Sequence, residues 1–356
     1  MNEKKQITED ELSQKDLEVL NAMIFKYDFK DKKYFENLEK LNLKFCDTKE
    51  IPKEIRKLKN LKKLKISYHK IQEIPQWLAE LKKLEKLDLS GNEIFQIPKE
   101  LGELRYLKKL DLRNNEIEQM PKELKNLKNL NLSCNKIKQI PKGLENLKFL
   151  EKLDLHYNEI KQSPKELGAL KNLKRIDLNG NKIQQIPKEF AGLKNLKKID
   201  LRENEIKEIP KELGKLKLLK KLDLSYNEIE QIPKELKNLK NLNLSCNKIK
   251  QIPKGLENLK FLEKLDLSYN EIKNISKELK NLKSLEKLDL SGNEILQIPK
   301  ELEELKNLKE FYFKNKKDIK QIPRGLENLK FLEKLDLSAR GDSTFSGIKK
   351  TCHIMK

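Results

Sequence analysis

Side chains that could support acid–base or metal chemistry are few and widely spaced. The three histidines are His69, His156 and His353, and none lies in a metal-binding spacing such as HExxH. Neither a P-loop nor a GxGxxG turn, the loops that cradle phosphates, occurs in the chain. The sequence therefore predicts no catalytic residue, no metal site and no bound cofactor, and His156 is interpreted as a surface histidine.

The four cysteines, Cys46, Cys134, Cys246 and Cys352, do not suggest a disulfide framework. Their spacing contains no CxxC pair, the usual sign of a zinc or redox site. Cys134 and Cys246 occupy the same place in two copies of a repeated segment, too many repeats apart to be bridged. We therefore expect free thiols in a reducing compartment.

The chain is strongly basic, with a formal net charge of +21 from 78 lysines and arginines against 57 acidic residues. Most of this excess is interpreted as a solvated surface, with binding to an anionic partner as the alternative. Residues 1–12 are polar, without the apolar core of a signal peptide, and no apolar run reaches membrane-spanning length. The sequence therefore predicts a cytoplasmic protein by default, and export without a leader stays open.

A repeated pattern organises the chain. Residues 84–106 have the sequence LEKLDLSGNEIFQIPKELGELRY, and the next copy begins at Leu107 with LKKLDLRNNEIEQMP. The pattern starts at Leu38, returns mostly every 23 residues, and forms about 13 full repeats and a partial one. The repeats that begin at Leu107 and Leu219 are three residues shorter than the others. Because each repeat of such an array packs only on its neighbours, no repeat is expected to be stable alone.

Each repeat predicts a strand, a turn and an outer segment. In LEKLDL, Leu87 and Leu89 alternate with Asp88, which predicts a strand with one buried and one exposed face. Asn92 follows, and its amide can satisfy backbone groups that no neighbouring strand reaches. Pro98 then fixes φ at the start of an outer helical turn. All 12 prolines of the chain occupy this column.

The pattern LxxLxLxxNxIxxIPxELxxLxx, over residues 38–338, resembles the leucine-rich repeat family, in particular the 23-residue bacterial class of the leptospiral leucine-rich repeat proteins. It is also similar to the Ras-associated eukaryotic scaffolds. The resemblance implies an α/β repeat fold, a curved solenoid with a parallel β-sheet on the concave face and short helical or 3-10 segments on the convex face. It further implies a non-enzymatic role in protein–protein interaction and, for the leptospiral type, contact with host proteins.

The chain is predicted to have three regions. Residues 1–37 form an N-terminal helical cap, since Thr8 and the acidic residues after it are typical of a helix start. Residues 38–338 form the array, and residues 339–356 are an irregular tail that lacks the repeat pattern. The tail is either a dedicated cap or the end of a truncated array. An incompletely covered apolar edge there predicts self-association.

Two segments of the chain, residues 121–155 and 233–267, are identical. The end of each short repeat lies inside or beside one of these segments, which indicates duplication of a cassette of five repeats. We interpret the duplication as neutral expansion of the array rather than as selection for a bivalent binding site.

The solvent-facing side of the predicted sheet holds the third, fifth, seventh and eighth positions of each repeat. The third is mostly Lys and the fifth mostly Asp, and strands in register would place like charges beside one another. These stripes are interpreted as structural, while the variable seventh and eighth positions are expected to select a partner, because Tyr and Arg often anchor interfaces. The predicted partner-binding residues are Arg113, Asn114, His156, Tyr157, Arg202, Glu203, Tyr226, Cys246 and Tyr269.

Two functions are compatible with these features. The first is a scaffold that binds a protein partner of unknown identity along the concave face. The alternative is binding of nucleic acid or another polyanion through the lysine-rich convex face, where Lys99, Lys122 and Lys142 recur. Interleaved glutamates, and the lack of aromatic residues stacked among the lysines, weigh against this alternative.

Overall fold

The computed structural model describes residues 32–44, 48–162, 164–252, 255–298, 300–314, 326 and 328–337. The chain forms two compact units, here called the N-terminal half (Met1–Glu159) and the C-terminal half (Ile160–Lys356). Within the described residues, no helix is long and apolar enough to cross a membrane.

Parallel strands, one from each repeat, form the sheet of the N-terminal half. They pair in chain order and in register, so that Leu87 lies beside Leu110 and Asp88 beside Asp111. The strands are β1 (Lys40–Lys44), β2 (Lys63–Ser67), β3 (Lys86–Asp88), β4 (Lys109–Asp111), β5 (Asn129–Asn131) and β6 (Lys152–Asp154).

The sheet of the C-terminal half is built in the same way. Its strands are parallel and again follow chain order, with Leu265 beside Leu288 as one example of the register. They are β7 (Arg175–Asp177), β8 (Lys198–Asp200), β9 (Lys221–Asp223), β10 (Asn241–Asn243), β11 (Lys264–Asp266), β12 (Lys287–Asp289), β13 (Glu310–Tyr312) and β14 (Lys334–Asp336).

Short 3-10 helices form the outer side of most repeats, and the proline column explains where they begin. Pro98 is the N-cap of one such helix and its carbonyl accepts the first i to i+3 hydrogen bond, from the N–H of Leu101 at 3.2 Å. Ser276 replaces proline once, and its side chain accepts a hydrogen bond from the N–H of Glu278 instead.

These helices, with one short α-helix near the start, have the following bounds. In the N-terminal half they are α2 (Lys32–Glu36), η1 (Lys53–Lys57), η2 (Gln76–Glu80), η3 (Lys99–Glu103) and η4 (Leu144–Asn146). In the C-terminal half they are η5 (Lys165–Ala169), η6 (Lys188–Gly192), η7 (Lys211–Lys215), η8 (Leu256–Asn258), η9 (Lys277–Asn281) and η10 (Lys300–Glu304).

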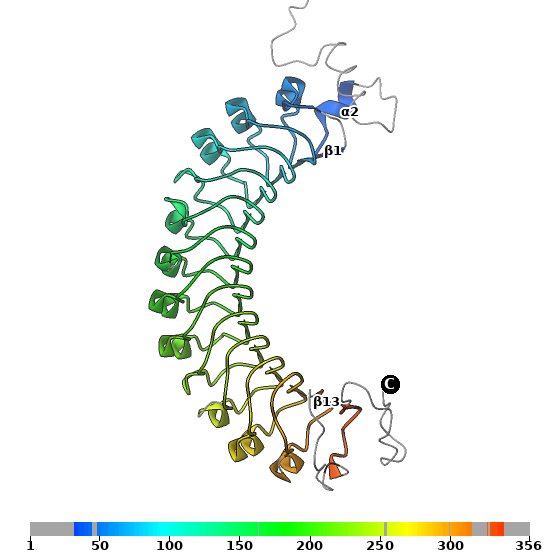
Figure 1. The fold of residues 1–356 in the computed structure, drawn as a ribbon. Coiled ribbons are helices and arrows are strands. Elements are labelled where there is room, and N and C mark those ends of the chain that lie inside the picture. Colours follow the sequence, from blue (N-terminus) through cyan, green and yellow to red (C-terminus); the bar gives the residue numbers. More distant parts are fainter. Residues whose placement is uncertain are drawn as a thin grey trace, which may run out of the picture. The chain divides into compact units, whose positions relative to one another are not determined.

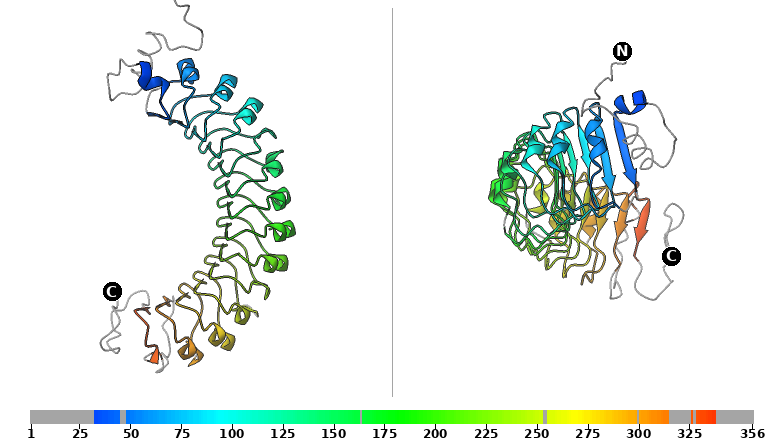
Figure 2. Two further views of the ribbon diagram at one scale, coloured as in Figure 1. Left: turned by 180° about the vertical axis from the view of Figure 1, so that it is seen from behind. Right: turned by 90° about the horizontal axis from the view of Figure 1, so that it is seen from above.

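In each half, taken by itself, the strands lie on the inner, concave side and the 3-10 helices on the outer, convex side (Figure 1). The view from behind shows the same arrangement (Figure 2). The predicted fold class, a curved leucine-rich repeat solenoid with a parallel sheet and short outer helices, is therefore confirmed.

The two short repeats lack an outer helix. The connections from β4 to β5 and from β9 to β10, which are described throughout, contain turns but no 3-10 helix. Three residues fewer leave too little chain to close a helical turn and still reach the next strand. The chain compensates by a shorter path on the convex side, and the strands keep their register.

Leucine and isoleucine columns fill the interior, and an asparagine ladder stabilises the turns. Asn92 is buried, its Nδ2 donates to the carbonyls of Leu89 and Ile66 at 2.9 and 3.0 Å, and its Oδ1 accepts from the N–H of Ile71 at 3.3 Å. The same amide thus bonds its own repeat and the preceding one. The equivalent residues are Asn115, Asn135, Asn158, Asn181, Asn204, Asn227, Asn247, Asn270 and Asn293.

Parts of the predicted domain organisation fall outside the described residues. Among these parts are the helix expected from Thr8 and the tail 339–356. Helix α2 lies within the predicted cap, where Phe35 is fully buried. The division into a cap, an array and a tail stays a prediction, as does self-association through the C-terminal edge.

Candidate partner-binding surface

The third and fifth positions of each repeat lie on its strand and face the concave side, as the alternation predicts. In β3 and β4, Leu87 and Leu110 are buried while the residues on either side are partly or fully exposed. The register places Lys86 beside Lys109 and Asp88 beside Asp111. Like charges therefore do lie side by side along the surface.

The fifth-position acid has a second role that the charge pattern did not reveal. Asp88 Oδ1 accepts hydrogen bonds from the backbone N–H of Ser90 at 3.1 Å and from its hydroxyl at 2.6 Å. In the repeat that begins at Leu127, Asn131 accepts the same two bonds from Ser133, at 2.9 and 2.7 Å. In most repeats this position is Asp or Asn, because the turn after the strand uses a side-chain oxygen there.

Burial makes some of these carboxylates reluctant to ionise. Burial raises the pKa of Asp111, and the neighbouring charge of Asp88 adds to the effect, although the N–H of Arg113 opposes it. Asp88 is different, because hydrogen bonds from Ser90 and Lys65 outweigh the effect of burial and lower its pKa. The fifth-position aspartates of successive repeats are here called the acidic stripe. Lys65, at the fifth position of the preceding repeat, stabilises the charge of Asp88 at one end of this stripe, with its Nζ 2.9 Å from Asp88 Oδ2.

The expectation that the seventh position faces outward is wrong where that residue is serine. Ser90, Ser133 and Ser225 are 1%, 0% and 2% exposed, because the hydroxyl turns inward to the fifth-position oxygen. Only longer side chains at this position reach the surface, as at Arg113. A serine at this position contributes to the turn and not to recognition.

The eighth position is the most regular source of exposed side chains, and its backbone is unusual. It adopts a left-handed conformation with φ between 49° and 71° in the described repeats, although most of the residues are not glycine. Such a conformation costs roughly 1 kcal/mol for a residue with a Cβ. The residues are Tyr68, Gly91, Asn114, Cys134, Tyr157, Gly180, Glu203, Tyr226, Cys246, Tyr269 and Gly292.

Tyrosine rings at this position lie over the next repeat. A Cβ added to Gly292 would be 2.7 Å from the ring of Tyr269, and one added to Gly91 would be 2.6 Å from the ring of Tyr68. Each ring therefore covers the bare backbone of a glycine in the following turn. The tyrosine is held from below while its other face stays open to solvent.

The two predicted arginines form ion pairs with fifth-position acids of their own repeat and, for Arg202, also of the next repeat. Arg113 lies 3.4 Å from Asp111, and Arg202 Nε lies 2.9 Å from Asp200 Oδ1 and 3.8 Å from Asp223 Oδ2. Both side chains are partly exposed, at 47% and 41%. They are oriented on the surface by ion pairs within the sheet.

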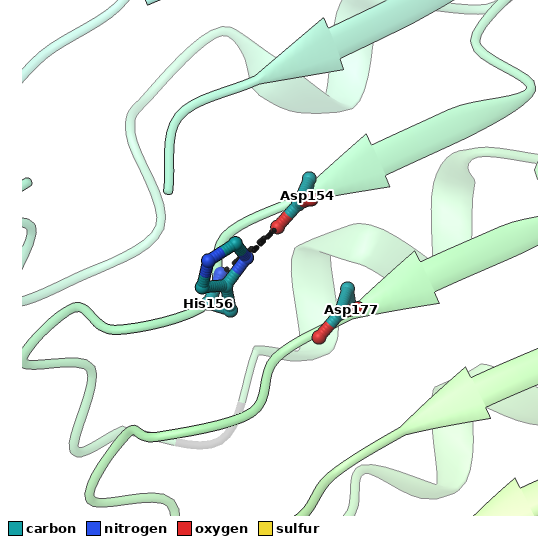
Figure 3. Close-up of side chains that lie close together, drawn as sticks. All are labelled: Asp154, His156 and Asp177. Atoms are coloured by element: carbon teal, nitrogen blue, oxygen red, sulfur yellow. Dashed lines mark hydrogen bonds and ion pairs between the residues drawn. The ribbon is translucent and has the colours of Figure 1, made fainter. Parts of the chain in front are cut away.

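His156 is held by a carboxylate rather than pointing freely into solvent. Its Nδ1 lies 2.6 Å from Asp154 Oδ1, and that oxygen also accepts the N–H of His156 at 3.2 Å (Figure 3). The ring of Tyr157, which is 50% exposed, meets the imidazole edge to face at 5.4 Å between centroids. Cys134 of the preceding repeat places its Sγ 3.9 Å from His156 Nε2.

In the C-terminal half, Tyr226, Cys246 and Tyr269 follow one another at the eighth position of three successive repeats. The two tyrosines are 59% and 64% exposed, and Cys246 is partly exposed. The Cys246 thiol raises the pKa of Tyr226, and the charge of Tyr269 contributes in the same direction. Backbone hydrogen bonds join the three turns, from the N–H of Tyr226 to the carbonyl of Ser245 and from that of Cys246 to Ser268. The three side chains on these adjacent turns are here called the tyrosine patch.

Two sequence models of known families match the chain. One, described as "Leucine-rich repeat region", matches residues 78–186, and one described as "Leucine rich repeat" matches residues 36–94, 171–229, 194–240 and 237–295. A leucine-rich repeat protein of Leptospira interrogans, LIC12759, is 36% identical in a superposition that covers 86% of each chain, with a TM-score of 0.70. The chain belongs to the leucine-rich repeat family.

Two further solved structures of leucine-rich repeat proteins are similar. An internalin of Listeria monocytogenes is 25% identical, with 92% of this chain and 95% of the internalin covered and a TM-score of 0.64. The plant peptide hormone receptor RGFR1, solved in complex with RGF2, is 32% identical, with 81% of this chain and 49% of the receptor covered and a TM-score of 0.67. No curated protein matches the chain. These likenesses support a role as a protein-interaction module.

For this leucine-rich repeat protein, the predicted residues divide into two groups. Those of the N-terminal half are Arg113, Asn114, His156 and Tyr157, and those of the C-terminal half are Arg202, Glu203, Tyr226, Cys246 and Tyr269. All are at least partly exposed.

Sequence reasoning left out two residues of the same surface. Tyr68 is 61% exposed at the eighth position of the second repeat, and counting eight residues from Leu61 could have found it. Cys134 is not among the predicted partner-binding residues, and its approach to His156 joins the eighth position of one repeat to the seventh of the next. Because the two residues belong to different repeats, this contact could not be predicted from the pattern of a single repeat.

Proposed function

We propose that this protein is a non-enzymatic scaffold that binds a protein partner on its concave surface, with the tyrosine patch as the main anchor. The observation that carries the proposal is that Tyr226 and Tyr269 are exposed on turns already fixed by backbone hydrogen bonds. The N–H of Tyr226 donates to the carbonyl of Ser245 at 2.9 Å, and that of Tyr269 to Ser291 at 2.7 Å. Side chains positioned before binding lose little entropy when a partner covers them.

The remaining predicted residues have supporting roles in this proposal. Arg202 and Glu203 lie in the repeat before Tyr226 and extend the tyrosine patch with charge of both signs. Arg113, Asn114, His156 and Tyr157 form a second contact region in the N-terminal half. RGFR1, which is 32% identical to this chain, has been solved in complex with RGF2. That complex supports the idea that this repeat architecture can bind a partner.

The binding test compares two exposed aromatic sites of the same half. Capture from cells and culture supernatant of the native source, followed by mass spectrometry, supplies the partner for affinity measurement. We expect the double variant Tyr226→Ala/Tyr269→Ala to lose roughly 30-fold or more in affinity, since interface tyrosines often contribute about 2 kcal/mol. Phe261→Ala is the matched control, because Phe261 is 60% exposed but is the last residue of its repeat, away from the tyrosine patch. Equal losses in both variants would contradict the assignment.

We further infer, from the likeness to leptospiral and Listeria proteins, that the partner is a host protein. This requires export, whereas the sequence by default predicts a cytoplasmic protein. Quantitative mass spectrometry of intact-cell, surface-shaved and supernatant fractions tests the inference. Recovery of the chain only from the cytoplasmic fraction, together with a partner from the same cell, would count against it.

Polyanion binding through the convex side is the second candidate, favoured by the net charge of +21. Many lysines outside the sheet are paired with glutamates of adjacent repeats, for example Lys82 with Glu103 at 2.7 Å and Lys248 with Glu228 at 3.1 Å. Such pairing leaves less positive charge for phosphate groups. A duplex DNA titration at increasing salt tests this candidate, since binding to a polyanion must weaken steeply with ionic strength.

A further inference from the structure

A thiol, an imidazole and a carboxylate form a connected series in the N-terminal half. Cys134 Sγ lies 3.9 Å from His156 Nε2, and His156 Nδ1 lies 2.6 Å from Asp154 Oδ1. The turns that carry Cys134 and His156 are joined by a backbone hydrogen bond of 2.8 Å from the N–H of Cys134 to the carbonyl of His156. All three side chains are partly exposed on the concave surface.

The carboxylate determines which nitrogen of the imidazole carries the proton. An ionised Asp154 can only accept hydrogen bonds, so Nδ1 of His156 is the donor in their contact. In the neutral ring Nε2 then has a free lone pair, and Nε2 is the nitrogen nearest to Cys134. A nucleophile next to a base that is oriented by a third group is the arrangement of an activated nucleophile.

Cys134 needs such a base to react. Burial raises the pKa of its thiol, and the nearby charge of Asp154 raises it further, so the resting group is a protonated thiol at neutral pH. The thiolate, and not the thiol, is the reactive form of cysteine. A base within reach of the S–H proton therefore changes the chemistry of this position.

We propose that Cys134 is a thiol activated by His156 that captures disulfides reaching the concave surface. His156 Nε2 removes the proton of Cys134, the sulfur attacks one sulfur of the incoming disulfide, and a new S–S bond forms while the old one breaks. The leaving sulfur takes up the proton from His156 and departs as a thiol. Cys134 is oxidised, the leaving sulfur is reduced, and no further oxidant is needed. The reaction is stoichiometric and goes beyond the proposed scaffold role without depending on its partner.

The chain contains a natural control for this proposal. Cys246 lies in the duplicated segment with the same local sequence and nearly the same backbone, φ 54° against 52°. The residue at the place of His156 is Ser268, whose hydroxyl donates to Asp266 at 2.6 Å. Cys246 therefore has the acid of the series but lacks the base.

The experiment measures second-order rate constants for two single-cysteine proteins at neutral pH with dithiodipyridine, an uncharged disulfide. Both carry Cys46→Ser and Cys352→Ser; one adds Cys246→Ser and retains Cys134, and the other adds Cys134→Ser and retains Cys246. We expect His156→Ser to slow Cys134 by roughly tenfold or more, and Ser268→His to accelerate Cys246 by a similar factor, since a positioned base often contributes about 100-fold. Asp154→Asn, which cannot orient the ring in the same way, is expected to slow Cys134 as well.

Circular dichroism and the unfolding midpoint show whether each variant is folded. If neither exchange of His and Ser changes the rate of its cysteine in folded protein, the proposal is overturned. If His156→Ser does not fold, the gain at Cys246 in Ser268→His decides the question alone. Parallel reactions with oxidised glutathione and with a peptide closed by one disulfide distinguish a small-molecule source from a protein source, and failure with all three reagents overturns the proposal.

Discussion

The identical segments 121–155 and 233–267 allow a comparison within one molecule. In both, the short repeat lacks an outer helix, the asparagine ladder is intact, and the cysteine at the eighth position has a left-handed backbone. Identical residues thus form the same local frame in the two halves.

The surroundings of the two cysteines nevertheless differ. Cys134 meets His156 of the next repeat, whereas Cys246 lies between Tyr226 and Tyr269. Local structure is therefore determined inside a repeat, but the chemistry of the concave surface is determined between repeats. A copied segment acquires a different surface when its neighbours differ.

The largest expected effect tests whether the asparagine ladder stabilises the two identical segments, 121–155 and 233–267, to the same extent. Asn135 and Asn247 each donate to three backbone carbonyls and accept from one buried N–H, at 2.9–3.1 Å. Asn135→Ala and Asn247→Ala should each lower the free energy of unfolding by about 2–4 kcal/mol, because those groups are left unsatisfied. Urea unfolding measures both, and a difference above about 1 kcal/mol would show that the two frames are not equivalent.

A smaller effect is expected where one repeat meets the next. Gly292→Ala adds a Cβ 2.7 Å from the ring of Tyr269 at a residue with φ of 71°. We expect a loss of about 1–2 kcal/mol from backbone strain and displacement of the ring. When Tyr269 is already replaced by Ala, the new Cβ meets no ring. Gly292→Ala should therefore lower the free energy of unfolding by less in the Tyr269→Ala protein than in the unchanged protein. Equal costs in both backgrounds, measured by thermal unfolding, would mean that the ring does not press on this turn.

Asp111 in the N-terminal half and Asp223 in the C-terminal half should respond to pH in the same direction. Burial raises the pKa of Asp111 and of its counterpart Asp223, each opposed by hydrogen bonds from the seventh position. A raised folded-state pKa means that the folded protein binds the proton more tightly, so these groups favour stability at low pH and lose that contribution as pH rises from the unfolded to the folded pKa.

Neutral replacements at these two positions should therefore stabilise the protein. Asp111→Asn and Asp223→Asn keep the side-chain oxygen that accepts the turn's hydrogen bond, as Asn131 does in its own repeat. Each should raise the free energy of unfolding by up to about 1 kcal/mol at neutral pH and by less at acidic pH. Asp88→Asn is the opposite control, because Lys65 and Ser90 lower the pKa of Asp88 against the effect of burial. The free energy of unfolding, measured at a series of pH values, should be lower for Asp88→Asn than for the unchanged protein at neutral pH.

The smallest effect concerns exposed ion pairs of the duplicated segments. Glu151 lies 3.8 Å from Lys128, and its counterpart Glu263 lies 2.5 Å from Lys240. Despite the different distances, Glu151→Gln and Glu263→Gln should each change the free energy of unfolding by less than about 0.5 kcal/mol, because exposed pairs contribute little. A larger loss in Glu263→Gln alone, in low-salt urea unfolding, would show that the two copies differ in the frame as well.

The strand, the turn and the outer segment of each repeat could be predicted because the same residue pattern recurs in every repeat. Leu87, Asn92 and Pro98 recur in fixed columns, and each column has one physical role: burial, backbone bonding or the start of a helix. The fold class followed from these columns. The absent helix of the short repeats was not predicted, since a deletion of three residues does not say which part of the path is lost.

The surface was harder to predict because polar residues can turn either way. Ser90 belongs to a residue type usually found at the surface, but its hydroxyl points inward to Asp88. The left-handed eighth position was hidden because Tyr, Glu and Cys, unlike glycine, do not indicate that conformation. The approach of Cys134 to His156 depends on a register between repeats that spans 22 residues and mixes two positions.

The packing of a tyrosine ring on the following turn has a consequence for how such arrays diversify. Tyr68 is followed one repeat later by Gly91, Tyr226 by Cys246 and Tyr269 by Gly292, so a large side chain is paired with a small one downstream. A single substitution at this column is therefore constrained by its neighbour. Insertion or loss of whole repeats escapes that constraint, because it carries compatible pairs together. Recombination between similar repeats would then be a faster route to a new binding surface than point mutation.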